Sequence, residues 1–156
     1  MEEKLTGRRG EVLRLGFAAR NWLLTQCVDN DALMNWKLDT TTRSPREIID
    51  HTAWVLSAVC MHISGELGIQ IDTANSSQQD ETAESTVKQT YEIFKELLST
   101  ITDEALDRNS MLPPPARIRE ASIETILRIM AGYHVIHHAG QVALLVSRAK
   151  NALDIS

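Results

Sequence analysis

Two histidines four residues apart, His134 and His138, could together hold a metal ion in this sequence of 156 residues. They lie in a segment whose apolar residues recur at intervals of three and four, the spacing of one helix face. On an α-helix, a separation of four residues places two side chains about 40° apart around the axis and roughly 6 Å apart along it. Both imidazoles can therefore point at one ion, and the pair predicts two nitrogen ligands from a single helix.

A third candidate ligand, His51, falls on the predicted inward face of an earlier helix. Three neutral imidazoles that converge in a helical bundle can bind Zn²⁺, Ni²⁺ or a similar borderline metal and leave positions open for water or substrate. A single inward histidine is more often a hydrogen-bonded core residue, but three buried together would all need polar partners, which a metal provides directly. We predict a metal site, with three hydrogen-bonded core histidines as the alternative.

The other two histidines are weaker candidates. His137 follows His134 by three residues and lies about 60° to its other side, so it competes for a ligand role or flanks the site. His62 shares the predicted face of His51 but is eleven residues further on, about 16 Å along the axis, which excludes a shared ion. Gln141, one turn beyond the pair, could orient a ligand or a bound water, or it could be an amide bonded to backbone at the end of the core.

Several familiar site types are missing from the sequence. The segment from His134 to His138 is not the HExxH motif of zinc proteases, because Val135 stands where that motif has its general-base Glu. No Glu-x-x-His pair occurs, which di-iron bundles repeat on two helices. Cys27 and Cys60 are far apart, so they form neither a CxxC redox pair nor a paired-cysteine zinc site. We expect two reduced, mostly buried thiols.

Four segments show the helical spacing of apolar residues and none alternates like a strand, so we predict an all-α protein, a four-helix bundle with long inter-helix connections. The first helix covers about residues 6–28. The second has the clearest start, with Ser44 as N-cap, Pro45 at the first position and Glu47 closing a capping box. The third follows a polar stretch at residues 70–79, and the last begins near Ser122, after a run of three prolines.

The predicted inward faces follow from the same spacing. The connections after the first and second helices are about fifteen residues each, long enough to cross an end of the bundle. The inward positions are Val12, Leu15, Ala19, Trp22 or Leu23, and Gln26 in the first helix; Ile48, His51, Val55, Ala58 and His62 in the second; Val87, Tyr91, Phe94, Leu97 or Leu98, and Ile101 in the third; and Ile123, Leu127, Met130, His134, His138, Gln141 and Leu145 in the last.

Length and charge narrow the class of protein. The length matches one domain, which we expect to span residues 1–156. A net charge of −5 with scattered basic residues predicts no nucleic-acid partner. No apolar run approaches the roughly 20 residues of a membrane span and no signal-peptide core follows the charged start, so we expect a cytoplasmic protein with no membrane association. Trp22, Leu24, Leu33 and Met34 could exceed what one bundle buries, which predicts a homodimer.

The segment from Ser44 to His51, preceded by Trp36, and the distant segment His134-Val-Ile-His-His-Ala-Gly-Gln141 resemble the DinB/YfiT-like superfamily of metalloenzymes over nearly the whole chain. The resemblance implies a four-helix bundle with an unusual connection order, in which one histidine of the second helix and an HxxxH pair of the last helix hold a divalent metal. The matching positions are His51, His134 and His138. Many relatives carry Arg where this chain has Ala139, so a contact with an anionic substrate at that position does not follow from the resemblance.

Characterised relatives include thiol-dependent transferases and isomerases that use low-molecular-weight thiols such as bacillithiol or mycothiol. A zinc or nickel ion with an open position would stabilise a thiolate. We therefore expect a metal-dependent enzyme, a thiol S-transferase or a hydrolase. The alternative is a non-catalytic, stress-associated binding or assembly module with a structural metal or none. No second catalytic group stands out, because Asp50 and Tyr133 both lie off the predicted faces.

Overall fold

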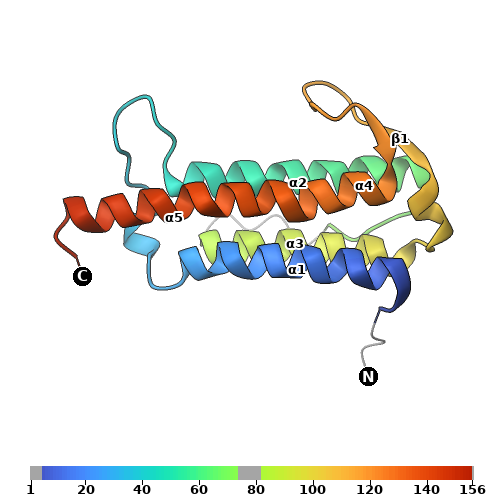
Figure 1. The fold of residues 1–156 in the computed structure, drawn as a ribbon, viewed down its shortest axis with the longest axis horizontal. Helices are drawn as coiled ribbons and strands as arrows, with labels where there is room; N and C mark the ends of the chain where they lie inside the picture. The colour runs from blue at the N-terminus through green and yellow to red at the C-terminus, as the bar shows by residue number, and fades with distance from the viewer. Residues whose placement is uncertain (1–4, 74–81, 156) are drawn as a thin grey trace.

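The computed structural model of the protein describes residues 5–73 and 82–155, and it is built from helices (Figure 1). The all-α prediction is confirmed, and the last predicted helix is continuous but contains a π-helical turn, η4. Two short strands, which the sequence analysis did not predict, form a hairpin before it. The elements are α1 (Gly7–Cys27), α2 (Pro45–Leu67), α3 (Ala83–Thr100), β1 (Asn109–Met111), β2 (Glu120–Ser122), α4 (Ile123–Arg128), η4 (Ile129–Tyr133) and α5 (His134–Ala152), with short 3₁₀ turns at Asp31–Leu33 and Glu104–Asp107.

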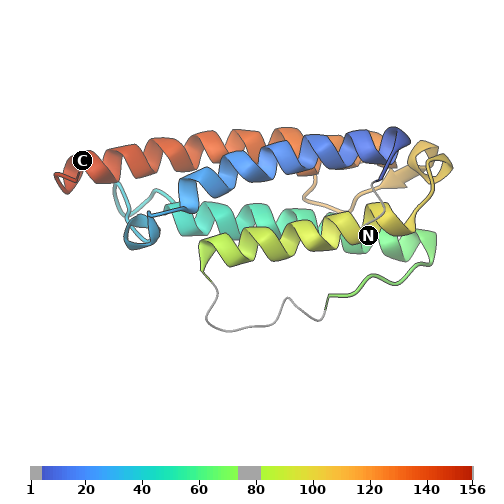
Figure 2. The same ribbon diagram turned by 90° about the horizontal axis from the view of Figure 1, so that it is seen from below.

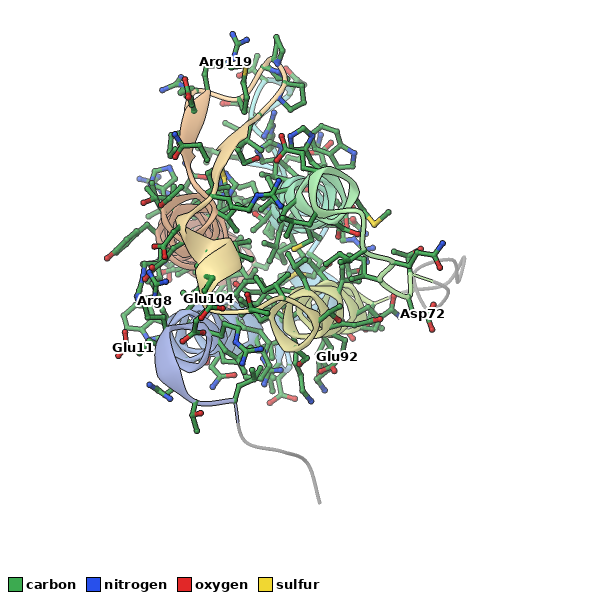
Figure 3. All side chains as sticks on the ribbon, turned by 90° about the vertical axis from the view of Figure 1, so that its right-hand side faces the viewer. Arg8, Glu11, Asp72, Glu92, Glu104 and Arg119 are labelled. Carbon is green, nitrogen blue, oxygen red and sulfur yellow. The ribbon has the colours of Figure 1, made fainter. Side chains whose placement is uncertain are left out.

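The four long helices occupy the corners of a square when the bundle is viewed along its axis (Figure 3). α1 packs against α3 and α5, and α2 packs against the same two helices, so α1 and α2 lie on a diagonal. α1 and α5 run in one direction and α2 and α3 in the other (Figures 1 and 2). The connection from α1 to α2 therefore crosses an end of the bundle, as expected. The polar stretch predicted at residues 70–79 lies largely outside the described residues.

The predicted helix starts are confirmed in atomic detail. Ser44 Oγ accepts a hydrogen bond from the backbone N–H of Glu47 at 3.2 Å, and Glu47 Oε2 accepts one from the backbone N–H of Ser44 at 2.7 Å. This reciprocal pair is the capping box, and Pro45 occupies the first helical position. Ser122 caps α4 by accepting from the backbone N–H of Thr125. Local sequence therefore determines where two of the helices begin.

The buried face of α3 is also as predicted. Tyr91, Phe94, Leu97 and Leu98 are almost fully buried. In α1, where two candidates were open, Leu23 is the buried one, and Trp22 is 66% exposed.

The predicted inward face of α2 is wrong after its first position, Ile48, which is buried. The deeply buried residues are Ile49, Leu56, Cys60 and Ile63, whereas His51, Val55 and His62 are only half-buried and Ala58 is exposed. Apolar residues cover more than one side of this helix, so spacing alone allowed two inward faces roughly 100° apart. The predicted face lies at the edge of the core, with Val55 packed against it. His51 is therefore at a helix seam and not in the core.

The predicted face of the last helix is wrong beyond residue 133, and the cause is η4. A π-helical turn holds one more residue than an α-turn, so it shifts every later side chain around the axis. Beyond η4 the buried residues are Val135, His138, Ala139, Val142, Val146 and Ala149. Of the predicted positions there, only His138 is buried, whereas His134 and Leu145 are half-buried and Gln141 is exposed. A single uninterrupted 3.6-residue period could not anticipate this shift.

The strands were missed because each has only three residues, too few to show alternation. Ser110 pairs with Ala121 in antiparallel register, and the hairpin encloses the three prolines. Figure 3 shows the hairpin rising beyond α2 and α5, with Arg119 pointing away from the bundle.

The expectation of buried, reduced thiols is confirmed. Cys27 and Cys60 are both free and buried. Burial raises the pKa of the Cys27 thiol to about 11 and that of Cys60 to about 12. Both thiols are therefore protonated and unreactive at neutral pH.

The residues that suggested a homodimer are mostly covered within one chain. Leu33 and Met34 are buried, Leu24 is half-buried, and of this group only Trp22 is well exposed. Dimerisation stays a prediction, now with Trp22 as its main support among those residues. None of the helices in the described part of the chain is long and apolar enough to cross a membrane.

Candidate metal centre

His51 from α2 and His134 and His138 from α5 come together at the seam between the two helices. One ring nitrogen from each lies within 4.8 Å of the others. The ring centroids of His51 are 5.9 Å from His134 and 5.4 Å from His138, and those of His134 and His138 are 4.4 Å apart. Nε2 of His134 and Nε2 of His138 are 3.0 Å apart. The structure thus brings together the three histidines that the sequence analysis selected.

His51 is placed by the start of α2. The capping box fixes the first turn of the helix, and His51 follows about two turns later on the side next to α5. The connection just before α2 is anchored at the same point, because the backbone N–H of Arg46 donates to the carbonyl oxygen of Met34 at 2.8 Å. The position of this ligand therefore depends mainly on hydrogen bonds between residues close in sequence.

His134 and His138 are placed by η4 and by contacts from other helices. Gly132 allows η4 to approach α1, because a Cβ on Gly132 would lie only 2.8 Å from Leu15 Cγ. The Tyr91 hydroxyl of α3 donates to the carbonyl oxygen of Ala131 at 2.6 Å, inside the π-helical turn. These contacts hold the turn from two sides. π-Helical turns often occur at functional sites, and this one directly precedes the first of the paired histidines.

The three histidines are neutral at pH 7. Burial, with smaller contributions from neighbouring histidines, lowers the pKa of His134 to about 4. Burial and then the charge of Arg43 lower the pKa of His51, and burial lowers the pKa of His138 although its hydrogen bond to Gln141 opposes the shift. Neutral imidazole is the form that coordinates a metal.

Gln141 sets the orientation of the His138 ring. Its Oε1 lies 2.8 Å from His138 Nδ1, and its Nε2 lies 3.1 Å from His137 Nε2. Because an amide oxygen only accepts, His138 Nδ1 carries the proton and its Nε2 presents a lone pair toward His134. The amide nitrogen donates to His137. Gln141 is thus placed to orient His138, one of the two roles considered for it, while His137 holds Gln141 and is not part of the three-nitrogen cluster.

The donor set fits a metal ion. Two imidazole nitrogens bound about 2.0–2.1 Å from one zinc ion lie roughly 3 Å apart, close to the separation of the two Nε2 atoms. His134 Nδ1 is buried and has no hydrogen-bond partner among the described residues. This nitrogen is not the Nε2 that faces His138, so the fit to a metal ion rests on the spacing of the two Nε2 atoms.

The cluster is accessible from one side. His51 and His134 are half-buried, and His137 and Gln141 beside them are exposed. Figure 1 shows two protruding segments on the face formed by α2 and α5, the connection leading into α2 at one end and the β1–β2 hairpin at the other. A small molecule could therefore reach the histidines from this face.

The remaining polar candidates lie elsewhere. His62 Nε2 is 3.2 Å from Glu66 Oε1 on the same helix, and His62 is not part of the cluster. Asp50 forms an ion pair with Arg46 at 2.8 Å, and Tyr133 is 61% exposed. Three features of the site were not predicted from the sequence: η4, the Tyr91 hydrogen bond and the charge of Arg43 near the histidines. The change in phase of the apolar residues between Met130 and Val135 was the available signal for η4.

Comparison with known proteins agrees with this architecture. The family model of the DinB superfamily matches residues 18–142, which include the three clustered histidines. No curated protein matches the sequence. The crystal structure of a DinB-like protein, YjoA from Bacillus subtilis, is similar with a TM-score of 0.62 and 19% sequence identity, covering 88% of this chain and 91% of that chain. Identity this low supports the shared fold alone. The match to the family model shows that the chain belongs to the DinB superfamily.

Proposed function

We propose that this protein is an enzyme dependent on one divalent metal ion held by His51, His134 and His138. The observation that carries the proposal is the convergence of three neutral imidazoles at a half-exposed seam. An all-imidazole donor set suits zinc or nickel, whereas magnesium and calcium prefer oxygen ligands. Gln141 would hold the His138 ring in its coordinating orientation, as such outer hydrogen bonds commonly do for metal-bound histidines.

The ion, when bound, would supply open coordination positions that lower the pKa of a thiol or a water molecule. The carboxylates that flank His51 on α2 are already engaged, Glu47 with Lys37 and Asp50 with Arg46. No acidic side chain belongs to the cluster of the described residues. This favours reactions in which the activated nucleophile acts without a carboxylate base, such as thiol S-transfer or simple hydrolysis.

Elemental analysis of purified, tag-free protein tests the metal site. We expect about one equivalent of zinc or nickel in the wild type and loss of that metal in His51→Ala and in His134→Ala, since each removes one of three ligands. His62→Ala is the matched control, because His62 is a half-buried histidine of α2 that lies outside the cluster. It should retain the metal. A wild type that takes up neither ion after incubation with both would contradict the proposal.

A second candidate function is a non-catalytic module in which the metal ties α2 to α5. It is favoured by the origin of the ligands, which come from two helices and meet at their seam. Removing the metal distinguishes the two functions. Loss of thiol-transfer or hydrolase turnover in protein that stays folded would support catalysis. A large fall in Tm, with no turnover detected in the metal-loaded protein for any thiol or ester tested, would support the structural role.

A further inference from the structure

A second feature lies on the same face of α5, a groove of about 480 Å³ between the C-terminal part of the helix and the connection that precedes α2. Trp36 and Leu38 line it from the connection, and Leu144, Arg148 and Asn151 are among its residues from α5. The groove belongs to neither of the functions proposed above. Its lining combines large apolar side chains with one guanidinium group.

The groove and the histidine cluster both involve α5. His138, Gln141, Leu144 and Arg148 follow one another at intervals of three and four, so they share one side of α5. At 1.5 Å per residue, Arg148 lies roughly 15 Å along the axis from His138. The connection that supplies Trp36 and Leu38 leads toward the histidines at its other end, where the charge of Arg43 lowers the pKa of His51 and of His138.

The wall formed by the connection is held in place by its own hydrogen bonds. Asp39 Oδ1 accepts from the backbone N–H of Thr41 at 2.7 Å, from the Thr41 hydroxyl at 2.7 Å and from the backbone N–H of Thr42 at 2.8 Å. Lys37 Nζ forms an ion pair with Glu47 at 2.8 Å, which ties the wall to α2. A groove formed before its ligand arrives saves the free energy of ordering the loop on binding.

The lining defines the chemistry of the occupant. Leu38 is 48% exposed and Leu144 is 58% exposed, so both leave apolar surface uncovered. Arg148 forms no ion pair or hydrogen bond with any residue that the structure describes. The described residues that line the groove include no acidic side chain. Apolar surface beside an unpaired guanidinium favours a molecule that carries both an apolar chain and an anionic group.

We propose that this groove binds an anionic, partly apolar small molecule, with the anion at Arg148 and the apolar part against Trp36, Leu38 and Leu144. That this molecule is the substrate, with its reactive end over the three histidines, rests on the proposed function. Binding in the groove itself does not depend on the proposed function, because none of the residues that line the groove is one of the three histidines.

Fluorescence of Trp36 tests the groove directly. The chain has three tryptophans, and Trp22 and Trp54 are about two-thirds exposed, so Trp22→Phe with Trp54→Phe leaves Trp36 as the reporter at little cost to folding. In the presence of EDTA, which keeps the protein metal-free, octyl phosphate should change the emission of Trp36 in a saturable way. Octyl glucoside has the same alkyl chain but no charge, and it should bind at least about tenfold more weakly. Arg148→Gln should weaken octyl phosphate by about fivefold to tenfold, while Lys150→Gln, a charge removed from α5 outside the groove, should not.

Equal binding of the charged and neutral amphiphiles, or equal weakening by Arg148→Gln and Lys150→Gln, would overturn the anion site. The same titration in His134→Ala should be unchanged. The two proposals can therefore fail separately. A protein that binds octyl phosphate but no metal would support the groove and contradict the proposed metal-dependent function.

The link between groove and histidines is tested with cobalt-loaded protein and two thiol carboxylates. Mercaptoundecanoate is long enough to place its thiol at the ion and its carboxylate at Arg148, whereas mercaptopropionate is too short. The long thiol should perturb the visible cobalt spectrum at about tenfold lower concentration than the short one, and Arg148→Gln should remove that preference. If both thiols perturb the cobalt spectrum of the wild-type protein at the same concentration, the groove does not contribute to binding at the metal site.

Discussion

The two helices that supply the histidines hold them by different means. On α2, His51 follows a capping box whose partners are three residues apart, so its position is determined locally. On the last helix, His134 and His138 follow a π-helical turn that depends on Gly132 against α1 and on the Tyr91 hydrogen bond from α3. One half of the site is therefore sensitive to local substitutions, and the other half to packing between distant segments.

The largest expected effect comes from filling the close approach at η4. Gly132→Ala places a methyl group 2.8 Å from Leu15 Cγ, so the Leu15 side chain must shift or α1 and η4 must separate. We expect a loss of about 3 kcal/mol in the free energy of unfolding, typical of overpacking in a core. Metal affinity should fall as well, because the paired histidines move with the turn.

Gly140→Ala is the matched control, since a Cβ there has no atom within 4 Å. An added methyl group in an exposed helix interior should leave stability unchanged or raise it by up to about 1 kcal/mol. Urea unfolding and zinc titration of both variants measure the difference. Equal behaviour of the two would show that the approach of η4 to α1 does not matter.

A smaller effect is expected when the hydrogen bond to η4 is removed. Tyr91→Phe leaves the buried Ala131 carbonyl without its partner, which should cost about 2 kcal/mol of stability. Because the ring is kept, packing with Phe17 and Phe94 is retained. Zinc affinity should fall although Tyr91 is not in the histidine cluster. Unchanged affinity in a destabilised variant would mean that η4 keeps its shape without this bond.

On α2, loss of the N-cap should mainly lower the free energy of unfolding. Ser44→Ala removes the acceptor of the Glu47 N–H and should cost about 1 kcal/mol. Ser44→Asp retains an acceptor and should restore most of that loss. We expect zinc affinity to change less than in Tyr91→Phe, because only the first turn frays. A larger loss of affinity in Ser44→Ala than in Tyr91→Phe would reverse the proposed contrast between the helices.

The smallest effect is the pH dependence of the metal-free protein. The pKa of His134 is about 4 in the folded state and 6.5 as its ordinary value. Between these values the unfolded chain binds a proton at His134 that the folded chain does not, so the contribution of His134 lowers stability as the pH drops from 6.5 toward 4 and is constant above 6.5. The ring is only half-buried, which reduces the effect. His134→Gln should flatten this part of the curve, and an equal slope in both proteins would exclude His134 as its source.

The sequence was sufficient for the features that depend on local pattern. The start of α2 could be read from Ser44, Pro45 and Glu47, and the buried face of α3 from the spacing of its large apolar residues. The three clustered histidines could be selected because histidine is unusual at positions where helical spacing predicts apolar residues, and because the segments around them resemble the DinB/YfiT-like superfamily. Each of these signals lies within one helix or one motif.

The features that were missed depend on contacts between distant segments. η4 approaches Leu15 and accepts a hydrogen bond from Tyr91, which lie on two other helices, and within residues 123–152 only the change in phase between Met130 and Val135 indicated it. The inward face of α2 was chosen wrongly because packing against α3 and α5, and not spacing, selects one of two apolar sides. The groove needs Trp36 and Arg148 side by side, although more than 100 residues separate them in the chain.

X-ray absorption spectroscopy of the zinc-loaded protein tests the central claim most directly. If His51, His134 and His138 hold the ion, the spectrum should fit three imidazole nitrogens at about 2.0–2.1 Å with lighter oxygen ligands and no sulfur. His137→Ala should keep all three imidazoles, and His51→Ala should lose one. A site with fewer than three imidazoles in the wild type, or one unchanged by His51→Ala, would contradict a metal centre shared by α2 and α5.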